Sequence, residues 1–317
     1  MIEIEGLTVT FTAGRKAIRA VNGVDLRVEQ GSVLALLGES GSGKSVTLRS
    51  LLRLHPEKRT RIGGSIRVAG RDVMALGRRD LADLRGRVVS MVFQEPMLAL
   101  DPVYTVGRQI TEAIRKHEGI TEAAARARAL ALFERVRIPS PARRLDAYPH
   151  EMSGGMRQRA MIALALACNP KVLLADEPTT ALDATVQIQI LLLLRELQRE
   201  LGLTVIFVTH DIGVAVEVAD RIAVMYAGRI VESGTVPEVI GDPRHPYTRG
   251  LLAARVDQAV PGSRLVTIPG APPDLADLPP GCAFAARCAS VGPGCEAQVP
   301  VLAARGQGDH QAACLLA

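Results

Sequence analysis

The sequence has no apolar run long enough to cross a membrane. Its most apolar stretches, Ala160–Ala167 and Ile188–Leu194, fall well short of the roughly 18 to 20 residues that a membrane-spanning helix needs. The N-terminus lacks a basic segment followed by an apolar one, so no secretory signal is visible. We therefore expect a chain that does not itself cross a membrane and that stays in the cytoplasm.

Cysteine and lysine are also scarce. Five cysteines, an odd number, in a chain without a signal indicate reduced thiols or metal ligands rather than a disulfide framework. Lysine supplies only five of the 38 basic residues, and the arginines are scattered among carboxylates, so the net charge of +5 carries no functional weight. The 48% of hydrophobic and 22% of charged residues exclude disorder, and 317 residues suggest about two domains or one with an appendage.

From Val33 to about Ile240, short apolar runs alternate with amphipathic stretches, which is typical of a mostly parallel sheet with helices. Four runs are apolar on both faces, as central parallel strands must be: Val33–Leu37, Val88–Phe93, Val172–Ala175 and Thr204–Val208. Between the second and third runs, residues 105–116 and 121–136 predict two helices without a strand. This interruption indicates an inserted helical subdomain at about residues 96–168.

A phosphate-binding motif follows the first of these runs. The motif fits G-x-x-x-x-G-K-[ST] and comprises Gly38, Glu39, Ser40, Gly41, Ser42, Gly43, Lys44 and Ser45, with Val46 opening a helical run. The glycines allow backbone N–H groups to curl around phosphate oxygens at a helix N-terminus. We expect Lys44 to reach the β- and γ-phosphates of ATP and the Ser45 hydroxyl to bind Mg²⁺. The flanking strand and helix disfavour the alternative, a glycine-rich turn with a solvated lysine.

An acidic pair, Asp176 and Glu177, ends the apolar run that begins at Val172. This position places both carboxylates at the carboxyl edge of a parallel sheet, where ligands bind in such folds. Asp176 can hold Mg²⁺, directly or through water, and Glu177 can act as general base toward an attacking water. A carboxylate pair alone is weak evidence, but after a phosphate-binding loop it strongly indicates nucleotide hydrolysis.

The segment Met152–Arg159 reads M-S-G-G-M-R-Q-R. Ser153 is a good N-cap, and the next two glycines admit an anion close to a helix N-terminus. Together with the two preceding motifs, this segment resembles the signature of the ATP-binding cassette (ABC) ATPases, with Met156 where Gln is usual. The resemblance implies that Ser153, Gly154 and Gly155 contact the γ-phosphate of ATP held by a partner subunit, so that two cassettes close head to tail around two nucleotides.

The resemblance extends to other positions. Gln94 looks like the Q-loop glutamine that senses Mg²⁺ and attacking water, and Ala181–Asp183 resembles the D-loop, with Asp183 near the nucleotide. His210 looks like the switch histidine that hydrogen-bonds the γ-phosphate. Phe11 is the expected aromatic for stacking on adenine, and the alternative for it is an ordinary strand residue. The implied fold class is α/β, a P-loop ABC domain with an inserted helical subdomain.

Several segments resemble the oligopeptide and dipeptide (Opp/Dpp) importer group within this family: Phe93–Pro102, His245–Thr248, Ile268–Pro273 and Gly281–Phe284. Composition also shifts near Asp242, and from Ala259 the chain is rich in proline and glycine. We therefore predict an ABC ATPase domain at 1–241 and a small, irregular C-terminal extension at 242–317.

Four cysteines lie in this extension: Cys282, Cys288, Cys295 and Cys314. Four thiolates can complete either a tetrahedral Zn²⁺ site or a [4Fe–4S] cluster, and metal-free cysteines are the third possibility. The spacing lacks the C-x2-C knuckles of zinc ribbons, and the resemblance points to iron–sulfur. In either metal case the expected role is structural, because the segment has few core-forming residues. Cys168, on a predicted buried helix, is interpreted as a small core residue.

The resemblance implies an ATPase subunit that powers peptide import from the cytoplasmic face of the membrane. Its implied partners are a second ABC subunit, favoured to be a paralogue, two membrane permease subunits and an extracytoplasmic binding protein, with no nucleic acid. One alternative keeps the importer but changes the cargo to nickel, glutathione or another solute. Another is a non-transport ABC ATPase that acts on nucleic acid or the ribosome.

Overall fold

The computed structural model describes residues 1–12, 16–180, 182–254, 267–304 and 308–317. The chain forms two compact units. Unit 1 comprises Met1–Val28, Ser32–Met74 and Val208–Ala317, and unit 2 comprises Glu29–Gly31 and Ala75–Phe207. The first unit therefore holds both ends of the chain, and the second is an insertion within it.

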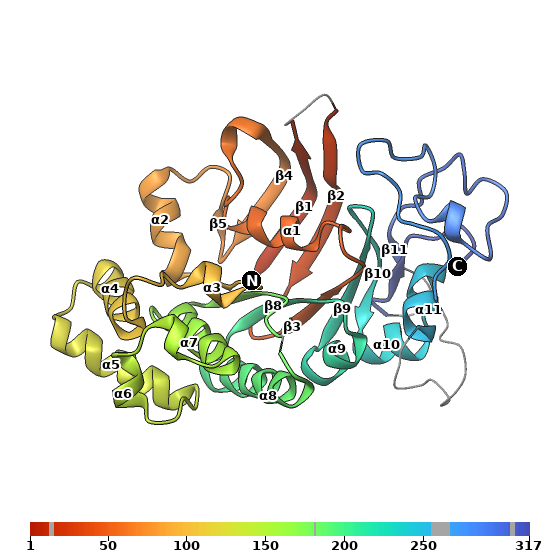
Figure 1. Ribbon diagram of the computed structural model, residues 1–317. Helices are drawn as coiled ribbons and strands as arrows, with labels where there is room; N and C mark the ends of the chain where they lie inside the picture. The colour runs from red at the N-terminus through yellow and green to blue at the C-terminus, as the bar shows by residue number, and fades with distance from the viewer. Residues whose placement is uncertain (13–15, 181, 255–266, 305–307) are drawn as a thin grey trace. The chain divides into compact units, whose positions relative to one another are not determined.

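An antiparallel sheet opens unit 1, with strand order β2-β1-β4-β5 (Figure 1). Its strands are β1 (Ile2–Phe11), β2 (Ile18–Val28), β4 (Thr60–Val68) and β5 (Arg71–Asp72). The apolar residues of β1 from Ile2 to Val9 alternate with exposed ones and are almost completely buried, as a strand with one buried face requires. A register shift between Ile4 and Leu7 includes Gly6, whose φ of 56° favours glycine.

The second sheet of unit 1 is built on β3 (Val33–Leu37), which pairs in parallel with β9 (Arg221–Tyr226). β9 turns back into antiparallel β10 (Arg229–Thr235), and the short strands β12 (Gln311–Ala312) and β11 (Ala303–Ala304) continue the ladder beyond β10. The chain's last segment thus joins a sheet that also contains the strand before the phosphate-binding motif.

Helices and irregular segments complete unit 1. They are α1 (Lys44–Leu51), α9 (Ile212–Val218), α10 (Val236–Gly241) and α11 (Pro246–Ala253), with short 3-10 turns η1 (Glu57–Arg59) and η4 (Ala285–Arg287). A buried core joins β9 to the C-terminal segment through Tyr226, Tyr247 and Phe284, whose ring centroids lie 4.5 to 5.4 Å apart. The C-terminal segment runs beside α11 (Figure 1, blue).

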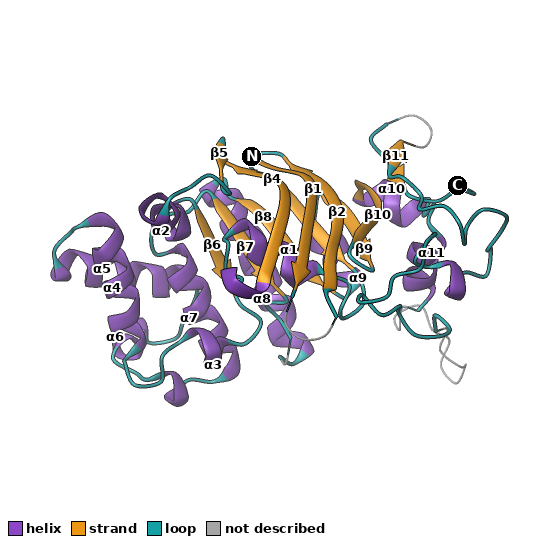
Figure 2. Cartoon of the chain, turned by 90° about the horizontal axis from the view of Figure 1, so that it is seen from above, coloured by secondary structure: helices purple, strands orange, loops and turns teal. Residues whose placement is uncertain are grey.

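Unit 2 combines strands with a group of helices. β6 (Val89–Val92) pairs in parallel with β7 (Val172–Asp176), and the chain leaves the unit within β8 (Thr204–Thr209). The helices are α2 (Arg78–Arg87), α3 (Pro96–Ala99), α4 (Val106–Glu118), α5 (Glu122–Arg135), α6 (Pro141–Leu145), α7 (Gly154–Leu166) and α8 (Ala184–Leu201), with the 3-10 turn η2 (Pro149–Glu151). α4, α5 and α6 pack against one another, and Figure 2 shows them gathered at one end of this unit.

The main elements predicted from the sequence are confirmed. The run Val33–Leu37 is β3 as predicted, and the other three apolar runs form β6, β7 and β8 with ends shifted by at most one residue. The two predicted helices are α4 and α5, which begin after the N-caps Thr105 and Thr121. No helix in the described ranges is both long and apolar enough to cross a membrane.

Candidate functional site

The phosphate-binding loop in unit 1 depends on two glycines in unusual conformations. Gly38 has a φ of 151° and Gly43 a φ of 105°, and both are buried. A Cβ on Gly38 would lie 2.2 Å from the Met225 carbonyl oxygen, and one on Gly43 would lie 2.5 Å from the Ala20 carbonyl oxygen. Neighbouring backbone therefore admits only glycine at both positions, which keeps the loop tight between β3 and α1.

Lys44 stands at the first position of α1 and is buried. Its Nζ donates hydrogen bonds to the carbonyl oxygens of Gly38 at 2.7 Å and Glu39 at 2.9 Å. The ammonium group is thus held inside the curve of the loop, where the N-terminus of α1 also favours an anion. Ser45 and Val46 follow in the first turn of α1 and are half-buried, so the serine hydroxyl stands at the same helix end.

Two other predicted residues of unit 1 lie at strand ends. Phe11 is the last residue of β1, half-buried, and its ring meets that of His55 edge-on at 5.5 Å. His210 directly follows β8 and is exposed. Adenine stacking by Phe11 and γ-phosphate contact by His210 stay predictions.

In unit 2, the acidic pair lies at the end of β7 as predicted. Asp176 is the last strand residue and is fully buried. Glu177 has a φ of 47°, which is strained for a residue with a side chain and is common at functional sites. Its Oε2 accepts hydrogen bonds from Gln94 Nε2 at 3.4 Å and from Thr180 Oγ1 at 3.0 Å. The structure therefore brings the predicted Q-loop glutamine and the predicted general base into contact.

The signature segment and the D-loop residue begin two helices of unit 2. Ser153 caps α7 by accepting a hydrogen bond from the Met156 N–H, and Asp183 caps α8 in the same way. A Cβ on Gly155 would lie 2.8 Å from Val186 Cγ1 of α8, so the small residue lets the two helix starts approach. Ser153 and Asp183 are exposed, and Ala181 lies outside the described residues.

The four cysteines of the C-terminal extension line one small cavity together with His245 and Phe284. Cys295 and Cys314 are buried, Cys282 and Cys288 are half-buried, and the Cys282 N–H donates to the Cys295 carbonyl oxygen at 2.7 Å. Burial raises the pKa of the Cys282 and Cys288 thiols. In the described residues no three His, Cys, Asp or Glu are spaced to hold a single metal ion.

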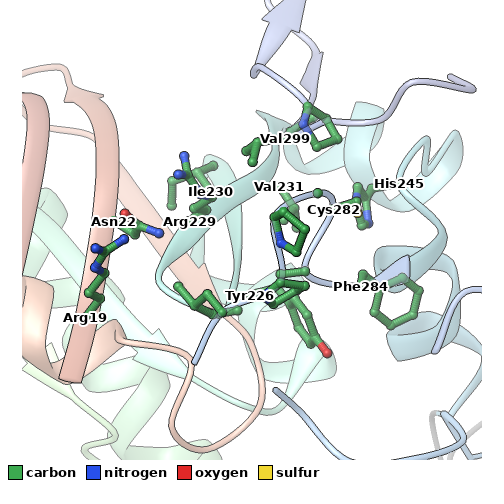
Figure 3. Close-up of a pocket in the computed structure, with 18 residues that line it drawn as sticks. Arg19, Asn22, Tyr226, Arg229, Ile230, Val231, His245, Cys282, Phe284 and Val299 are labelled. Atoms are coloured by element: carbon green, nitrogen blue, oxygen red, sulfur yellow. The ribbon is translucent and has the colours of Figure 1, made fainter. Parts of the chain in front are cut away.

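A second cavity in unit 1, of about 280 Å³, lies between the β9–β10 hairpin and the C-terminal extension. Figure 3 shows Arg19 and Asn22 of β2 on one side of it and Cys282 and Phe284 on the other. Most of its lining is apolar, and burial lowers the pKa of the half-buried Arg229 guanidinium at its wall. No sequence motif predicted this cavity.

Comparison with known proteins identifies the family. A model described as "ABC transporter" matches residues 21–180, and one described as "Oligopeptide/dipeptide transporter, C-terminal region" matches residues 231–295. The chain belongs to the ABC transporter family. A Brucella abortus protein named "Putative peptide import ATP-binding protein" is 49% identical over 96% of this ABC chain and 92% of its own length. A second Brucella abortus protein, also named as a putative peptide import ATP-binding protein, is 50% identical over 99% of this chain and 96% of its own length.

Solved structures agree with these relatives. The dimeric structure of a bacterial ABC transporter cassette aligns with a TM-score of 0.67 and 30% identity, covering 74% of this chain and 99% of that one. The structure of cbiO1 from Clostridium perfringens, part of an ABC transporter complex, aligns with a TM-score of 0.65 and 29% identity, covering 76% and 90%. The predicted α/β ABC fold, the ATPase activity and the family assignment are confirmed.

Two residues that contact the phosphate-binding loop, Tyr247 and Arg287, were not predicted to do so. Glu39 was expected only as a loop member, yet its carboxylate pairs with Arg287 of η4 and its N–H donates to the Tyr247 hydroxyl at 2.8 Å. Both partners belong to the C-terminal extension. The sequence gives no signal for either contact, because 208 and 248 residues separate the partners from Glu39.

Proposed function

We propose that this ABC ATPase powers the import of peptides through a separate membrane permease. The observation that carries this proposal is the presence, in one chain, of an ABC cassette and an oligopeptide/dipeptide transporter C-terminal region. Relatives that match nearly end to end carry peptide import in their names. The chain then acts as a peripheral subunit at the cytoplasmic face of the membrane, with two permease subunits and an extracytoplasmic binding protein.

The residues of unit 1 bind the triphosphate in this proposal. The N–H groups of the loop and Lys44 Nζ bind phosphate oxygens, and Lys44 exchanges its contacts to the loop carbonyls for the β- and γ-phosphates. Phe11 stacks on adenine, and His210 donates to the γ-phosphate. Mg²⁺, when bound, would neutralise charge on the phosphates. The Ser45 hydroxyl of unit 1 and, by the chemistry of its side chain, the Asp176 carboxylate of unit 2 are oxygen donors of the kind that Mg²⁺ takes.

The residues of unit 2 act on the attacking water. Glu177 accepts its proton as general base, and Gln94, hydrogen-bonded to that carboxylate, orients both. A second cassette, favoured to be a paralogue, supplies its own signature residues across the dimer, and this chain's Ser153, Gly154, Gly155 and Asp183 serve the partner's nucleotide. The position of Gly154 and Gly155 in the first turn of α7 supports this role, because the first N–H groups of a helix favour an anion.

Transport by cells that express the chain tests the proposed function. Cells with wild-type protein should accumulate a labelled tripeptide, and cells with Glu177→Gln should not, while both take up free alanine equally. Loss of nickel or glutathione uptake instead would select the other-solute alternative. Unchanged uptake of all three, together with salt-sensitive binding of the purified chain to nucleic acid, would select the non-transport alternative.

We also propose that the four cysteines of the extension hold a [4Fe–4S] cluster. Four soft thiols around one cavity suit iron and sulfide. The cluster would order the part of the extension after α11, where the described residues form only short turns and two-residue strands. Zn²⁺ held by the same thiols is the alternative metal.

Metal analysis of protein purified without oxygen tests the cluster. We expect about four iron and about four acid-labile sulfide per chain. Cys288→Ser should lose iron, whereas Cys168→Ser should keep it, because Cys168 lies in the core of unit 2 with its Sγ 3.7 Å from the Ala113 carbonyl oxygen. Zinc or no metal in the wild-type protein would refute the iron–sulfur assignment.

A further inference from the structure

Glu39 of the phosphate-binding loop is held by several hydrogen bonds. Its carbonyl oxygen accepts hydrogen bonds from Lys44 Nζ at 2.9 Å and from the Ser42 N–H at 3.2 Å. Its N–H donates to the Tyr247 hydroxyl at 2.8 Å. Before nucleotide binds, the Glu39 carbonyl therefore helps to hold the ammonium group that binds the phosphates in the proposed function.

The side chain of Glu39 is held by a two-point ion pair with Arg287. Nη1 of Arg287 lies 2.8 Å from Oε2 and Nη2 lies 3.0 Å from Oε1. Such a fork-shaped pair fixes geometry as well as charge. The arginine side chain is only 5% exposed and that of Glu39 is 28% exposed, so the pair is largely shielded from water.

The surroundings of Arg287 lock it in place. Its Nε donates to the Pro269 carbonyl oxygen at 2.8 Å and its Nη1 also reaches the Tyr226 hydroxyl at 3.3 Å. Its guanidinium stands 5.8 Å from the ring centroids of Tyr226 and Phe284, two of the residues drawn in Figure 3. The hydrogen bonds that Arg287 donates to the Glu39 carboxylate raise the pKa of Arg287, so the cation is permanent.

The ion pair with Arg287 also offsets the repulsion between the Glu39 carboxylate and the phosphates. A bare carboxylate one residue after Gly38 would repel the phosphates that the loop binds, because charges a few ångströms apart in a partly buried site interact strongly. Arg287 cancels that charge. We infer that Arg287 is a positioning residue for ATP binding: through Glu39 it sets the shape and charge of the phosphate-binding loop, and so makes the C-terminal extension part of the nucleotide site.

This inference rests on the proposed ATP site and is tested by titrating the nucleotide-free protein with Mg·ATPγS. Arg287→Ala should weaken binding at least tenfold. Glu39→Gln should weaken it about threefold, and the Arg287→Ala/Glu39→Gln double variant should bind within threefold of Glu39→Gln, because the repelling charge is gone. A merely structural role for Arg287 would not give this recovery. In turnover assays the KM for ATP should rise and kcat should change by less than threefold.

Two controls separate the possible failures. Arg244→Ala removes another arginine of the extension, whose Nε lies 3.5 Å from Asp242 Oδ2, and this variant should bind Mg·ATPγS within twofold of wild type. Lys44→Ala tests the proposed site itself. Wild-type binding by Lys44→Ala would overturn the site, whereas loss of binding in Lys44→Ala with wild-type binding in Arg287→Ala would overturn only the role of Arg287. Equal weakening by Arg244→Ala would also overturn it.

Discussion

Replacing Gly281 with alanine tests how the cysteine-containing segment is packed. Gly281 is buried, and a Cβ there would lie 2.3 Å from the Glu296 carbonyl carbon and 2.4 Å from the Cys295 carbonyl oxygen. These are backbone atoms, so no side chain can rotate away. Reaching an ordinary carbon–carbon contact of about 3.5 Å requires the two segments to part by roughly 1 Å. The hydrogen bond from the Cys282 N–H to the Cys295 carbonyl oxygen, now 2.7 Å, would then be lost.

The size of the effect follows from these two losses. Overpacking costs about 1 to 3 kcal/mol and the lost hydrogen bond costs about 1 kcal/mol, for a total of about 2 to 4 kcal/mol. Since 1.4 kcal/mol is a factor of ten, native-state hydrogen exchange of the amides in 281–298 should accelerate by about 30-fold to 1000-fold.

Gly292→Ala provides the matched control in the same segment. Its Cβ would meet only Leu316 methyl groups at 3.4 and 3.5 Å, which are ordinary contacts. Alanine there reduces the freedom of the unfolded chain, so exchange should be unchanged or slower. If the amides of 281–298 exchanged at rates within threefold of each other in the Gly281→Ala and Gly292→Ala variants, the packing of residue 281 against residues 295–296 would be refuted.

Three further predictions address the catalytic residues and the buried histidines. Glu177→Gln should bind ATP yet hydrolyse it at least 100-fold more slowly, and Lys44→Ala should weaken both binding and hydrolysis; wild-type turnover by Glu177→Gln would remove its role as base. Burial lowers the pKa of His245 to about 4, so the unfolded chain binds more protons between that value and 6.5. Stability present above pH 6.5 should therefore fall by up to about 3 kcal/mol as the pH drops toward 4, and His245→Asn, which keeps a helix-capping acceptor, should flatten this part of the unfolding profile. His310→Ala removes a donor 2.8 Å from the fully buried Glu232 and should cost about 2 to 3 kcal/mol in thermal unfolding; an unchanged melting temperature would contradict this.

The parallel strands could be predicted from the sequence because a strand that is buried on both faces has an unbroken apolar run. Val33–Leu37 and Val172–Ala175 have no polar residue, and both strands are buried throughout. The antiparallel strand β1 was not among the predicted strands, apart from the alternative given for Phe11, although Ile2 and Ile4 alternate with glutamates. The bulge that includes Gly6 shifts this alternation, so the period of two is lost after four residues.

The candidate site was predictable where chemistry depends on local sequence. The glycines of the phosphate-binding loop, the N-caps Ser153 and Asp183, and the carboxylates at the end of β7 each lie at or next to the strand or helix that positions them. Contacts between distant segments leave no such pattern. The left-handed backbone of Glu177 and its contact with Gln94, 83 residues away, required the structure.

The structure also changes what the C-terminal extension means for this ABC ATPase. The sequence predicts a boundary near residue 242 from a change in composition, yet Val208–Ala317 belongs to the same compact unit as the phosphate-binding loop. The family models likewise match 231–295 as a region of its own, so composition and homology both record where the extension begins. Neither records that Tyr247 and Arg287 hold the second residue of the loop. The Glu39–Arg287 pair therefore links the loop to the extension, and under the inference above it is what makes a carboxylate at that position compatible with phosphate binding.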